Sequence, residues 1–237
     1  MIPPRQILVT GGSGLLGTEL RKLIPTASFP TSAEFDVTDF AQMDAWVRPR
    51  DFRLILHAAA FTSPPKVDKD PLRAMEVNIQ GTLQVVKLCM AHNLRLVYVS
   101  TDYVFRGDQG NYREDDPVFP VNKYAWSKLG GECAVRMYAN ALVVRTTFGP
   151  NVFPYEKAFV DQWTSRECVS RIAEKLVKLL THDVTGVIHL GGPRRTVHEY
   201  ACSLDPNREI QRLSIHEVGF RVPVDTSLNC ERYDQLS

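Results

Sequence analysis

A tyrosine and a lysine four residues apart, Tyr124 and Lys128, are the side chains of this sequence best suited to moving a proton. Residues at this spacing lie on one face of a helix. A phenol ionises at about pH 10, so it exchanges protons at neutrality only where a neighbouring cation stabilises its phenolate. A strand-end hydroxyl, Thr101, would hydrogen-bond the reacting oxygen. We predict acid–base catalysis by these three residues; the alternative for Tyr124 and Lys128 is a solvated helix face.

A glycine-rich segment, Thr10 to Gly17, lies between an apolar run and a segment with helical periodicity. It satisfies GxGxxG from Gly12 and GxxGxxG from Gly11, in the strand–turn–helix context that a dinucleotide fingerprint needs. Glycine permits the tight turn, and the free N–H groups at the helix start attract a diphosphate. We predict that the turn containing Gly11, Ser13 and Gly17 binds a dinucleotide; a glycine turn without a ligand is the alternative.

The adenosine end of such a cofactor would lie near two further segments. Asp36 follows Gly17 by about 20 residues, the spacing at which an acid binds the ribose of NAD, although a turn or cap role fits it equally well. A strand ending at 27–29 would leave Thr31 beside the ribose. With hydroxyls and no carboxylate at this strand end, a 2′-phosphate is not repelled. The sequence therefore favours NADP(H) over NAD(H).

The elements that must position these residues alternate along the chain. Apolar runs over 7–10, 54–57, 94–100 and 142–146 are typical of strands covered on both faces, and helical periodicity occupies 15–23, 40–47 and 71–92. Strands and helices in alternation predict an α/β fold, a Rossmann-type doubly wound parallel sheet with its ligand beyond the carboxyl ends of the strands.

We expect two units, a dinucleotide-binding domain over 1–150 and a small, abbreviated substrate-capping region over 151–237. The second unit carries a helix over 166–180, a strand over 186–190 and a helix over 197–204. It is small for an independent core, so we expect it to pack on the sheet edge.

Composition narrows the class of protein. The chain has 237 residues with 44% hydrophobic and 23% charged residues, as in ordinary globular proteins, and its net charge of +1 offers no field for nucleic acid or a membrane surface. No apolar run approaches the roughly 18 residues of a membrane span. Five cysteines without a CxxC pair fit reduced thiols, so we expect a cytoplasmic protein. No group of residues has metal-ligand spacing, and we predict no metal site.

Taken together, these motifs resemble the extended short-chain dehydrogenase/reductases and, within them, the dTDP-4-dehydrorhamnose reductases. The likeness is dense over residues 6–150 and returns in patches beyond them. It is carried by the glycine turn, Asp36 to Asp39, Ala58 to Thr62, Asn78, Ser100 to Phe105, Tyr124 to Lys128 with Gly131 and Glu132, Arg145 to Phe148, and short stretches around 160–164, 186–191 and 221–228.

The resemblance implies roles for individual residues. Diphosphate contacts would come from Gly14, Leu15 and Leu16, and adenine contacts from Asp36 and Val37. The inner half of the cofactor would contact Ala60, Phe61 and Thr62, with Ala58 also binding the cofactor, and the sugar would contact Thr101, Asp102 and Phe148. Tyr124 and Lys128 would be the catalytic pair and would also contact the cofactor. The implied reaction is hydride transfer from NAD(P)H to the C4 ketone of a nucleotide-linked 4-keto-6-deoxy sugar, in an enzyme whose candidate assembly is a homodimer.

Departures from the family pattern keep other functions open. His57 replaces an asparagine, and the stretch between Phe148 and Val160 is shorter than in the family. A shortened substrate region favours a cofactor-binding regulatory protein resembling the β subunit of methionine adenosyltransferase. A sugar-nucleotide epimerase or dehydratase would use the same cofactor, but Asp102-Tyr103 is not the acidic pair expected of a dehydratase.

Overall fold

The computed structural model describes residues 2–219 and 221–236, and within these ranges five parallel strands form the central sheet in the order β1-β2-β3-β4-β9. The strands are β1 (Ile7–Thr10), β2 (Leu54–His57), β3 (Arg95–Thr101), β4 (Ala141–Thr146) and β9 (Gly186–Leu190). Every residue of β1 to β4 is buried. The strands predicted from apolar runs are therefore confirmed to within one residue at each end.

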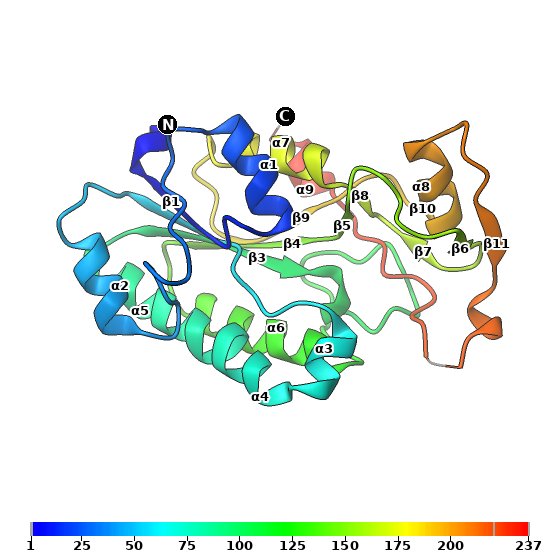
Figure 1. Ribbon diagram of the computed structural model, residues 1–237, viewed down its shortest axis with the longest axis horizontal. Coiled ribbons are helices and arrows are strands. Elements are labelled where there is room, and N and C mark those ends of the chain that lie inside the picture. Colours follow the sequence, from blue (N-terminus) through cyan, green and yellow to red (C-terminus); the bar gives the residue numbers. More distant parts are fainter. Residues whose placement is uncertain (1, 220, 237) are drawn as a thin grey trace.

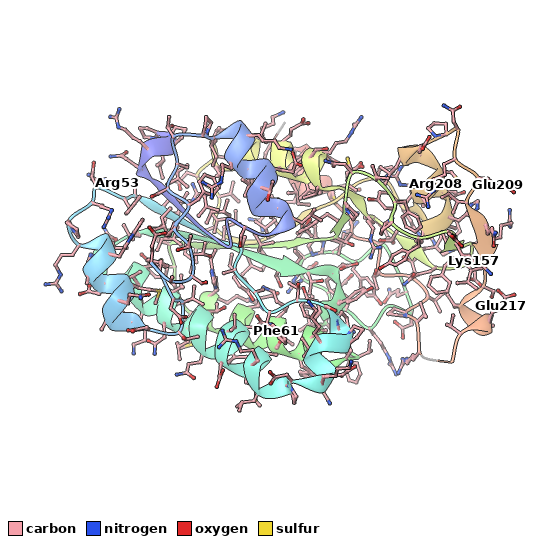
Figure 2. The ribbon with its side chains drawn as sticks, in the orientation of Figure 1. Arg53, Phe61, Lys157, Arg208, Glu209 and Glu217 are labelled. Carbon is pink, nitrogen blue, oxygen red and sulfur yellow. The ribbon has the colours of Figure 1, made fainter. Side chains whose placement is uncertain are left out.

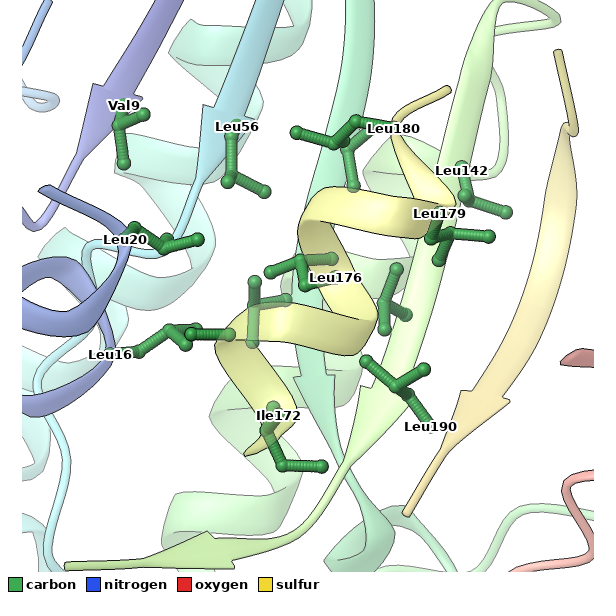
Figure 3. Close-up of a cluster of buried hydrophobic side chains, with 14 of the residues drawn as sticks. Val9, Leu16, Leu20, Leu56, Leu142, Ile172, Leu176, Leu179, Leu180 and Leu190 are labelled. Carbon is green, nitrogen blue, oxygen red and sulfur yellow. The ribbon is translucent and has the colours of Figure 1, made fainter. Parts of the chain in front are cut away.

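Helices cover both faces of this sheet (Figure 1). On one face lie α1 (Leu15–Leu23) and α7 (Val169–Leu179); on the other lie α2 (Phe40–Val47), α5 (Thr82–His92) and α6 (Lys123–Val135). Side chains alternate along each strand, so that Val9, Leu56 and Leu142 pack under α1 and α7 in the core of Figure 3, while their neighbours pack under the other helices. The predicted doubly wound α/β fold is confirmed.

The chain reverses its direction of winding at β1, which creates the crevice where such sheets bind ligands. After α1 the chain returns on one side of β1, where the Val9 N–H donates to the Ser28 carbonyl at 2.8 Å, and it then crosses to β2 on the other side. The strand expected to end at 27–29 is reduced to this single bridge. Pro25 and Pro30 bracket the segment and have no N–H to continue a ladder.

The helix predicted over 71–92 is interrupted. It consists of α4 (Pro71–Ala74), a π-helical segment (Met75–Gly81) and α5, and it follows a helix that sequence did not predict, α3 (Pro64–Lys69). Short 3₁₀ turns occur at Pro4–Gln6, Asp102–Val104 and Ile215–Glu217. A π turn inside a helix often marks a functional site.

The remaining elements form small paired strands at one end of the molecule (Figure 1). They are β5 (Phe148–Gly149) with β8 (Glu167–Cys168), β7 (Trp163–Thr164) with β10 (Arg195–Thr196), and β6 (Lys157–Phe159) with β11 (Gln211–Leu213), with α8 (Val197–Leu204) beside the last of them. The last helix, α9 (Glu231–Asp234), packs instead against the central sheet near β9. In Figure 2, Lys157, Arg208 and Glu217 mark this end, opposite Arg53.

In the C-terminal half, one helix begins later than expected, and two elements belong to the main sheet and its covering layer. The helix expected over 166–180 begins only at Val169, because Glu167 and Cys168 pair with β5 and leave Arg166 in an extended segment. α7 and β9 lie beyond residue 150 and complete the main sheet; the division of the chain at that residue stays a prediction. Among the described residues, no helix is long and apolar enough to cross a membrane.

Candidate active site

A cleft of about 970 Å³ opens at the carboxyl ends of β1 to β4. Its size is at the upper end of small-molecule pockets. Every site residue predicted from the sequence lines it: Gly11, Ser13, Gly14, Leu15, Leu16, Gly17, Thr31, Asp36, Val37, Ala58, Ala60, Thr62, Thr101, Asp102, Tyr124, Lys128 and Phe148. The structure thus brings together side chains from segments that are far apart in the sequence.

The glycine turn between β1 and α1 requires its glycines. Gly11 has φ +75°, and a Cβ there would lie 2.7 Å from the Ala59 nitrogen. A Cβ on Gly17 would collide with the carbonyl of Gly11. α1 begins after Gly14 without a side-chain cap, so the amides of its first turn face the cleft region unprotected. This is the backbone cradle that a diphosphate needs.

His57 is a structural residue beneath this turn. Its Nδ1 lies 2.7 Å from the Thr10 hydroxyl and its Nε2 lies 3.1 Å from the Thr82 hydroxyl, and the Thr10 hydroxyl also accepts from the Ala59 N–H. Complete burial, with the nearby charge of Lys128, lowers the pKa of His57 to about 3. The neutral ring therefore fixes the ends of β1 and β2 against α5 and takes no part in proton transfer at neutral pH.

Asn78, in the π-helical segment, joins the loop after β2 to α6. Its Oδ1 accepts from the Phe61 N–H at 2.7 Å, and its Nδ2 donates to the Phe61 carbonyl and to Ser127 Oγ at 2.9 and 2.8 Å. Ser127 Oγ in turn donates to the Tyr124 carbonyl at 2.7 Å. Phe61 is labelled in Figure 2, on the loop above α6. Asn78 is thus a positioning residue for the helix that carries Tyr124.

The Thr101 hydroxyl lies beside the Tyr124 phenol and acts to lower the pKa of that phenol. A hydrogen bond from Thr101 to the reacting oxygen of a substrate stays a prediction. Burial, together with the charge of Asp102, raises the pKa of Tyr124 above its ordinary value. This direction is opposite to the one expected from a lysine neighbour. The phenol is therefore fully protonated at neutral pH.

Lys128 is buried on the same helix face. Its Nζ lies 4.2 Å from the centroid of the Tyr98 ring. Burial lowers the pKa of Lys128 to about 7, and the buried carboxylate of Glu132 opposes this shift. Glu132 is itself engaged by Arg145, so it gives Lys128 only partial compensation. The ammonium is consequently poised to lose its charge near neutrality.

Asp102 connects the end of β3 to the C-terminal segment. Its Oδ1 accepts from the Thr101 hydroxyl at 3.0 Å and its Oδ2 accepts from the Thr226 hydroxyl at 2.7 Å. Burial raises the pKa of Asp102, and these hydroxyls partly offset the shift. This contact ties the segment around residue 226 to the end of β3.

The adenosine end of the cleft differs from the sequence analysis, which expected hydroxyls and no carboxylate at this strand end. The Thr31 hydroxyl donates to the Glu34 carboxylate at 2.8 Å, so a carboxylate does lie at this strand end. Asp36 accepts from the N–H and hydroxyl of Thr38, as a turn residue does. Arg21, which sequence reasoning missed, lines the cleft with its guanidinium 4.4 Å from the centroid of Phe29. Its place on α1, four residues after Gly17, was the available signal.

Arg166 and Thr226 are the other residues that sequence reasoning missed. Arg166 lines the cleft, and Thr226 binds Asp102. A single arginine in an extended segment and a single threonine near the end of a chain have no spacing that marks them. Arg166 reaches the cleft from the segment between β7 and β8, and Thr226 meets Asp102 because the chain near its end returns to the end of β3.

A doubly wound sheet with a glycine turn at its switch point defines a nucleotide-binding α/β protein. Residues 5–167 match the family described as the RmlD substrate binding domain, and the chain belongs to this family. The resemblance predicted from the motifs is confirmed.

Relatives and a solved structure extend the comparison. The dTDP-4-dehydrorhamnose reductase of Mycobacterium tuberculosis is 30% identical over 86% of this chain and 77% of that protein. Methionine adenosyltransferase 2 subunit beta of Pongo abelii is 26% identical over 99% of this chain and 83% of that protein. The structure of a hypothetical dTDP-4-dehydrorhamnose reductase from Sulfolobus tokodaii has a TM-score of 0.86 and 27% identity, covering 98% of this chain and 94% of that one.

Proposed function

We propose that this chain is an NAD(P)H-dependent reductase that acts on the C4 ketone of a nucleotide-linked 4-keto-6-deoxy sugar. The observation that carries the proposal is the meeting of Thr101, Tyr124 and Lys128 in the same cleft as the glycine turn. Membership of the family, and a reductase relative that shares 30% identity across most of this chain, support it.

The residues of the cleft fit a nicotinamide dinucleotide. A Cβ at Gly11 or Gly17 would collide with the protein's own backbone, so glycine at both positions is what allows the turn to be tight. Amides at Gly14, Leu15 and Leu16 would hold its diphosphate, and Ala58, Ala60 and Thr62 would line its inner half. When bound, the reduced nicotinamide supplies a hydride to the ketone carbon.

The protonation states in the cleft suit reduction. Tyr124 has a raised pKa and keeps its proton at neutral pH, so it can give that proton to the alkoxide that forms at C4. The Thr101 hydroxyl lies beside the phenol and would help to position it. The Lys128 ammonium, one helical turn away, stabilises the phenolate that remains.

We propose a preference for NADPH over NADH. Arg21 supports this proposal because it lines the cleft near Thr31 and, among residues 2–219 and 221–236, pairs with no carboxylate. Glu34 acts against it, but its carboxylate does not line the cleft and is held by Thr31. The Arg21→Gln variant should lose about 10-fold in NADPH affinity with little change for NADH. Equal losses for both cofactors would refute the preference.

The function is tested by following the oxidation of NADPH and NADH against a panel of dTDP- and UDP-linked 4-keto-6-deoxy sugars. We expect turnover with one sugar nucleotide. The Tyr124→Phe variant should lower kcat by about 100-fold or more, because it removes the proton donor. Its affinity for NADP⁺ should stay within about 2-fold of the original chain. Undiminished turnover in this variant, or cofactor binding without reduction of any sugar, would contradict the proposal.

A second candidate is a cofactor-binding regulatory subunit. The coverage of the match to methionine adenosyltransferase 2 subunit beta favours it, because that match spans 99% of this chain whereas the reductase match spans 86%. Gel filtration of the purified chain with a purified methionine adenosyltransferase catalytic chain tests it. Co-elution together with cofactor binding and no ketone reduction would favour the regulatory function.

We propose a homodimer formed by exposed apolar side chains on and beside α5 and α6. Leu83, Trp126 and Met137 are exposed by 45%, 55% and 83%. Large apolar side chains that are exposed in one chain are candidates for burial against another. Light scattering should give a dimer mass for the original chain and a monomer mass for Trp126→Glu; a monomer in both would refute the assembly.

We also propose that the protein works in the cytoplasm. The five cysteines, all within the described ranges, are free, and Cys89 is buried. Free thiols persist in a reducing compartment. Localisation of a fluorescent fusion to any other compartment would refute this.

A further inference from the structure

Tyr98 lies on β3 against Lys128, and its aromatic ring is in contact with the lysine ammonium. α6, which carries Lys128, covers this part of β3 on one face of the sheet (Figure 1). The Tyr98 side chain is completely buried, and its hydroxyl donates to the Lys128 main-chain carbonyl at 3.1 Å. The Lys128 Nζ lies over the same ring, 4.2 Å from its centroid. The hydroxyl therefore fixes the ring relative to α6, and the ring meets the charge of the lysine.

The Tyr98 ring is itself held in place by its neighbours. His57 packs against it, with the two ring centroids 5.6 Å apart and the ring planes at 34°. The nitrogens of His57 lie 2.7 and 3.1 Å from the hydroxyls of Thr10 and Thr82. Gly131 on α6 leaves room for the Tyr98 hydroxyl, because a Cβ there would lie 2.7 Å from that oxygen. The position of the ring is thus set by the protein before any ligand binds.

The Lys128 ammonium has no carboxylate of its own. Glu132, one helical turn further along α6, accepts from Arg145 Nη2 at 2.5 Å and from the Ser100 hydroxyl at 3.0 Å. Among residues 2–219 and 221–236, neither a hydrogen bond nor an ion pair of Lys128 Nζ is found. The face of an aromatic ring is negative and attracts a cation, most strongly where water is excluded. The Tyr98 ring is therefore placed to stabilise the charged form of the lysine.

The other titratable groups around Lys128 do not replace the ring as a partner of its charge. They come from β2, the turn after β3, α6 and β4, and they are His57, Asp102, Tyr124, Glu132 and Arg145. His57 and Tyr124 are neutral at neutral pH, because burial lowers the pKa of the imidazole and raises that of the phenol. Glu132 and Arg145 neutralise each other, and both oxygens of Asp102 accept hydroxyls. The π-helical segment and α5 approach Gly131 through Asn78 and Thr82, which do not titrate.

We propose that Tyr98 is a positioning residue of the active site, which holds the Lys128 ammonium against the face of its ring and keeps it charged. The assignment rests on the proposed reductase function, in which this ammonium stabilises the Tyr124 phenolate. Burial lowers the pKa of Lys128 to about 7, so a further fall would remove the charge at neutral pH. An interaction that favours the charged amine acts against such a fall.

NMR titration of the full chain with ¹³C-labelled lysines tests this assignment. The Lys128 signal is the one missing from the spectrum of Lys128→Arg, and in the original chain its midpoint should lie at about pH 7. Tyr98→Phe keeps the ring face, so the midpoint should stay within about 0.3 pH unit. Monofluoro- and trifluorophenylalanine in place of Tyr98 keep the ring but make its face less negative. The midpoint should then fall stepwise, by about 0.5 to 1 pH unit with three fluorines.

Tyr98→Leu, which removes the ring, should lower the midpoint by about 1 pH unit. Circular dichroism reports whether each variant is folded; if Tyr98→Leu is not, the fluorinated series carries the test. The matched control is Tyr138, whose hydroxyl makes the same kind of bond, to the Leu94 carbonyl at 2.9 Å. The same phenylalanines in place of Tyr138 should leave the Lys128 midpoint unchanged. A midpoint that does not respond to fluorination at Tyr98, or that responds equally at Tyr138, would overturn the proposal.

The consequence for catalysis is measured separately. In the fluorinated Tyr98 variants, the descending limb of kcat/KM against pH should move to lower pH by the same amount as the Lys128 midpoint. A structural role alone would lower the rate without moving the limb, so a limb that stays in place while the midpoint falls would also overturn the proposal. Failure of the reductase function is detected as the absence of cofactor oxidation with every sugar nucleotide in the original chain, and the NMR titration does not depend on that result.

Discussion

Lys128 and Tyr124 depart from their ordinary ionisation in opposite directions. Burial raises the pKa of the phenol and lowers that of the ammonium to about 7. A lysine carries its charge below its pKa and loses it above. Because the charged form stabilises the phenolate, we predict that kcat/KM for ketone reduction falls as the pH rises through about 7.

The pH profile of Lys128→Arg is the control for this prediction. Arginine stays charged throughout the range, so the descending limb of the profile should move to higher pH even where the absolute rate falls. A limb that stays near neutrality in this variant would assign the titration to another group. His57 is not that group, since burial holds its pKa at about 3.

At the scale of single residues, spacing decided what the sequence could predict. Tyr124 and Lys128 form a pair four apart, and Thr101 ends an apolar run, so each carries a signal. Arg166 carries none, because an isolated arginine is ordinarily a solvated surface residue, and Arg21 carries only its place four residues after Gly17. The pKa of Tyr124 was predicted in the wrong direction, since burial and the Asp102 charge outweigh a lysine that lies over Tyr98.

At the scale of elements, the π-helical segment is the part of the scaffold that places Tyr124. Asn78 in this segment makes three hydrogen bonds, two to the Phe61 main chain and one to Ser127. Asn78→Ala would leave these groups without partners and allow α6 to shift. We predict a loss of about 3 kcal/mol in the free energy of unfolding and a fall of about 100-fold in kcat.

Chemical denaturation and steady-state kinetics measure these two effects. The matched control is Asn93→Gly, an exposed asparagine at the end of α5 with φ 51°, a conformation that glycine adopts readily. It should change both quantities little. A variant of Asn78 that loses stability but keeps its kcat would show that α6 is held by other contacts.

The periodicity of apolar residues predicted the strands and helices that form the core. It failed where prolines or strand pairing determine the local backbone instead. The strands β1 to β4 and the helices α1 and α2 follow from their apolar patterns. Near Ser28 the flanking prolines reduce a strand to a bridge, and at Glu167 pairing with β5 delays the start of α7. The π turn around Asn78 could not be predicted, because the apolar residues of this segment still repeat every three and four positions.

At the scale of the whole molecule, the site is built from both ends of the chain. The first part provides the glycine turn and the strand ends, while the segment near Thr226 returns across the carboxyl ends of the strands and binds Asp102. The Asp225 N–H donates to the Gly107 carbonyl at 2.9 Å beside it. We therefore predict that the last segment affects binding of the sugar nucleotide, which Asp102 is predicted to contact, and not binding of the cofactor.

The Thr226→Val variant tests this division. Valine keeps the shape of threonine but removes the hydroxyl that donates to the buried Asp102, so the free energy of unfolding should fall by about 1–3 kcal/mol. The KM for the sugar nucleotide should rise, while the dissociation constant of NADP⁺ should stay unchanged, because the contact lies on the substrate side.

The control is Thr38→Val at the adenosine end of the cleft. It removes a similar hydrogen bond, 2.8 Å long, from the Thr38 hydroxyl to the Asp36 carboxylate. That bond is only partly buried, so its loss should cost less stability, and any change in binding should appear with the cofactor and not with the sugar nucleotide. If both variants weaken the binding of NADP⁺ and of the sugar nucleotide equally, the two halves of the cleft do not act separately. The C-terminal segment would then stabilise the fold as a whole rather than the substrate half.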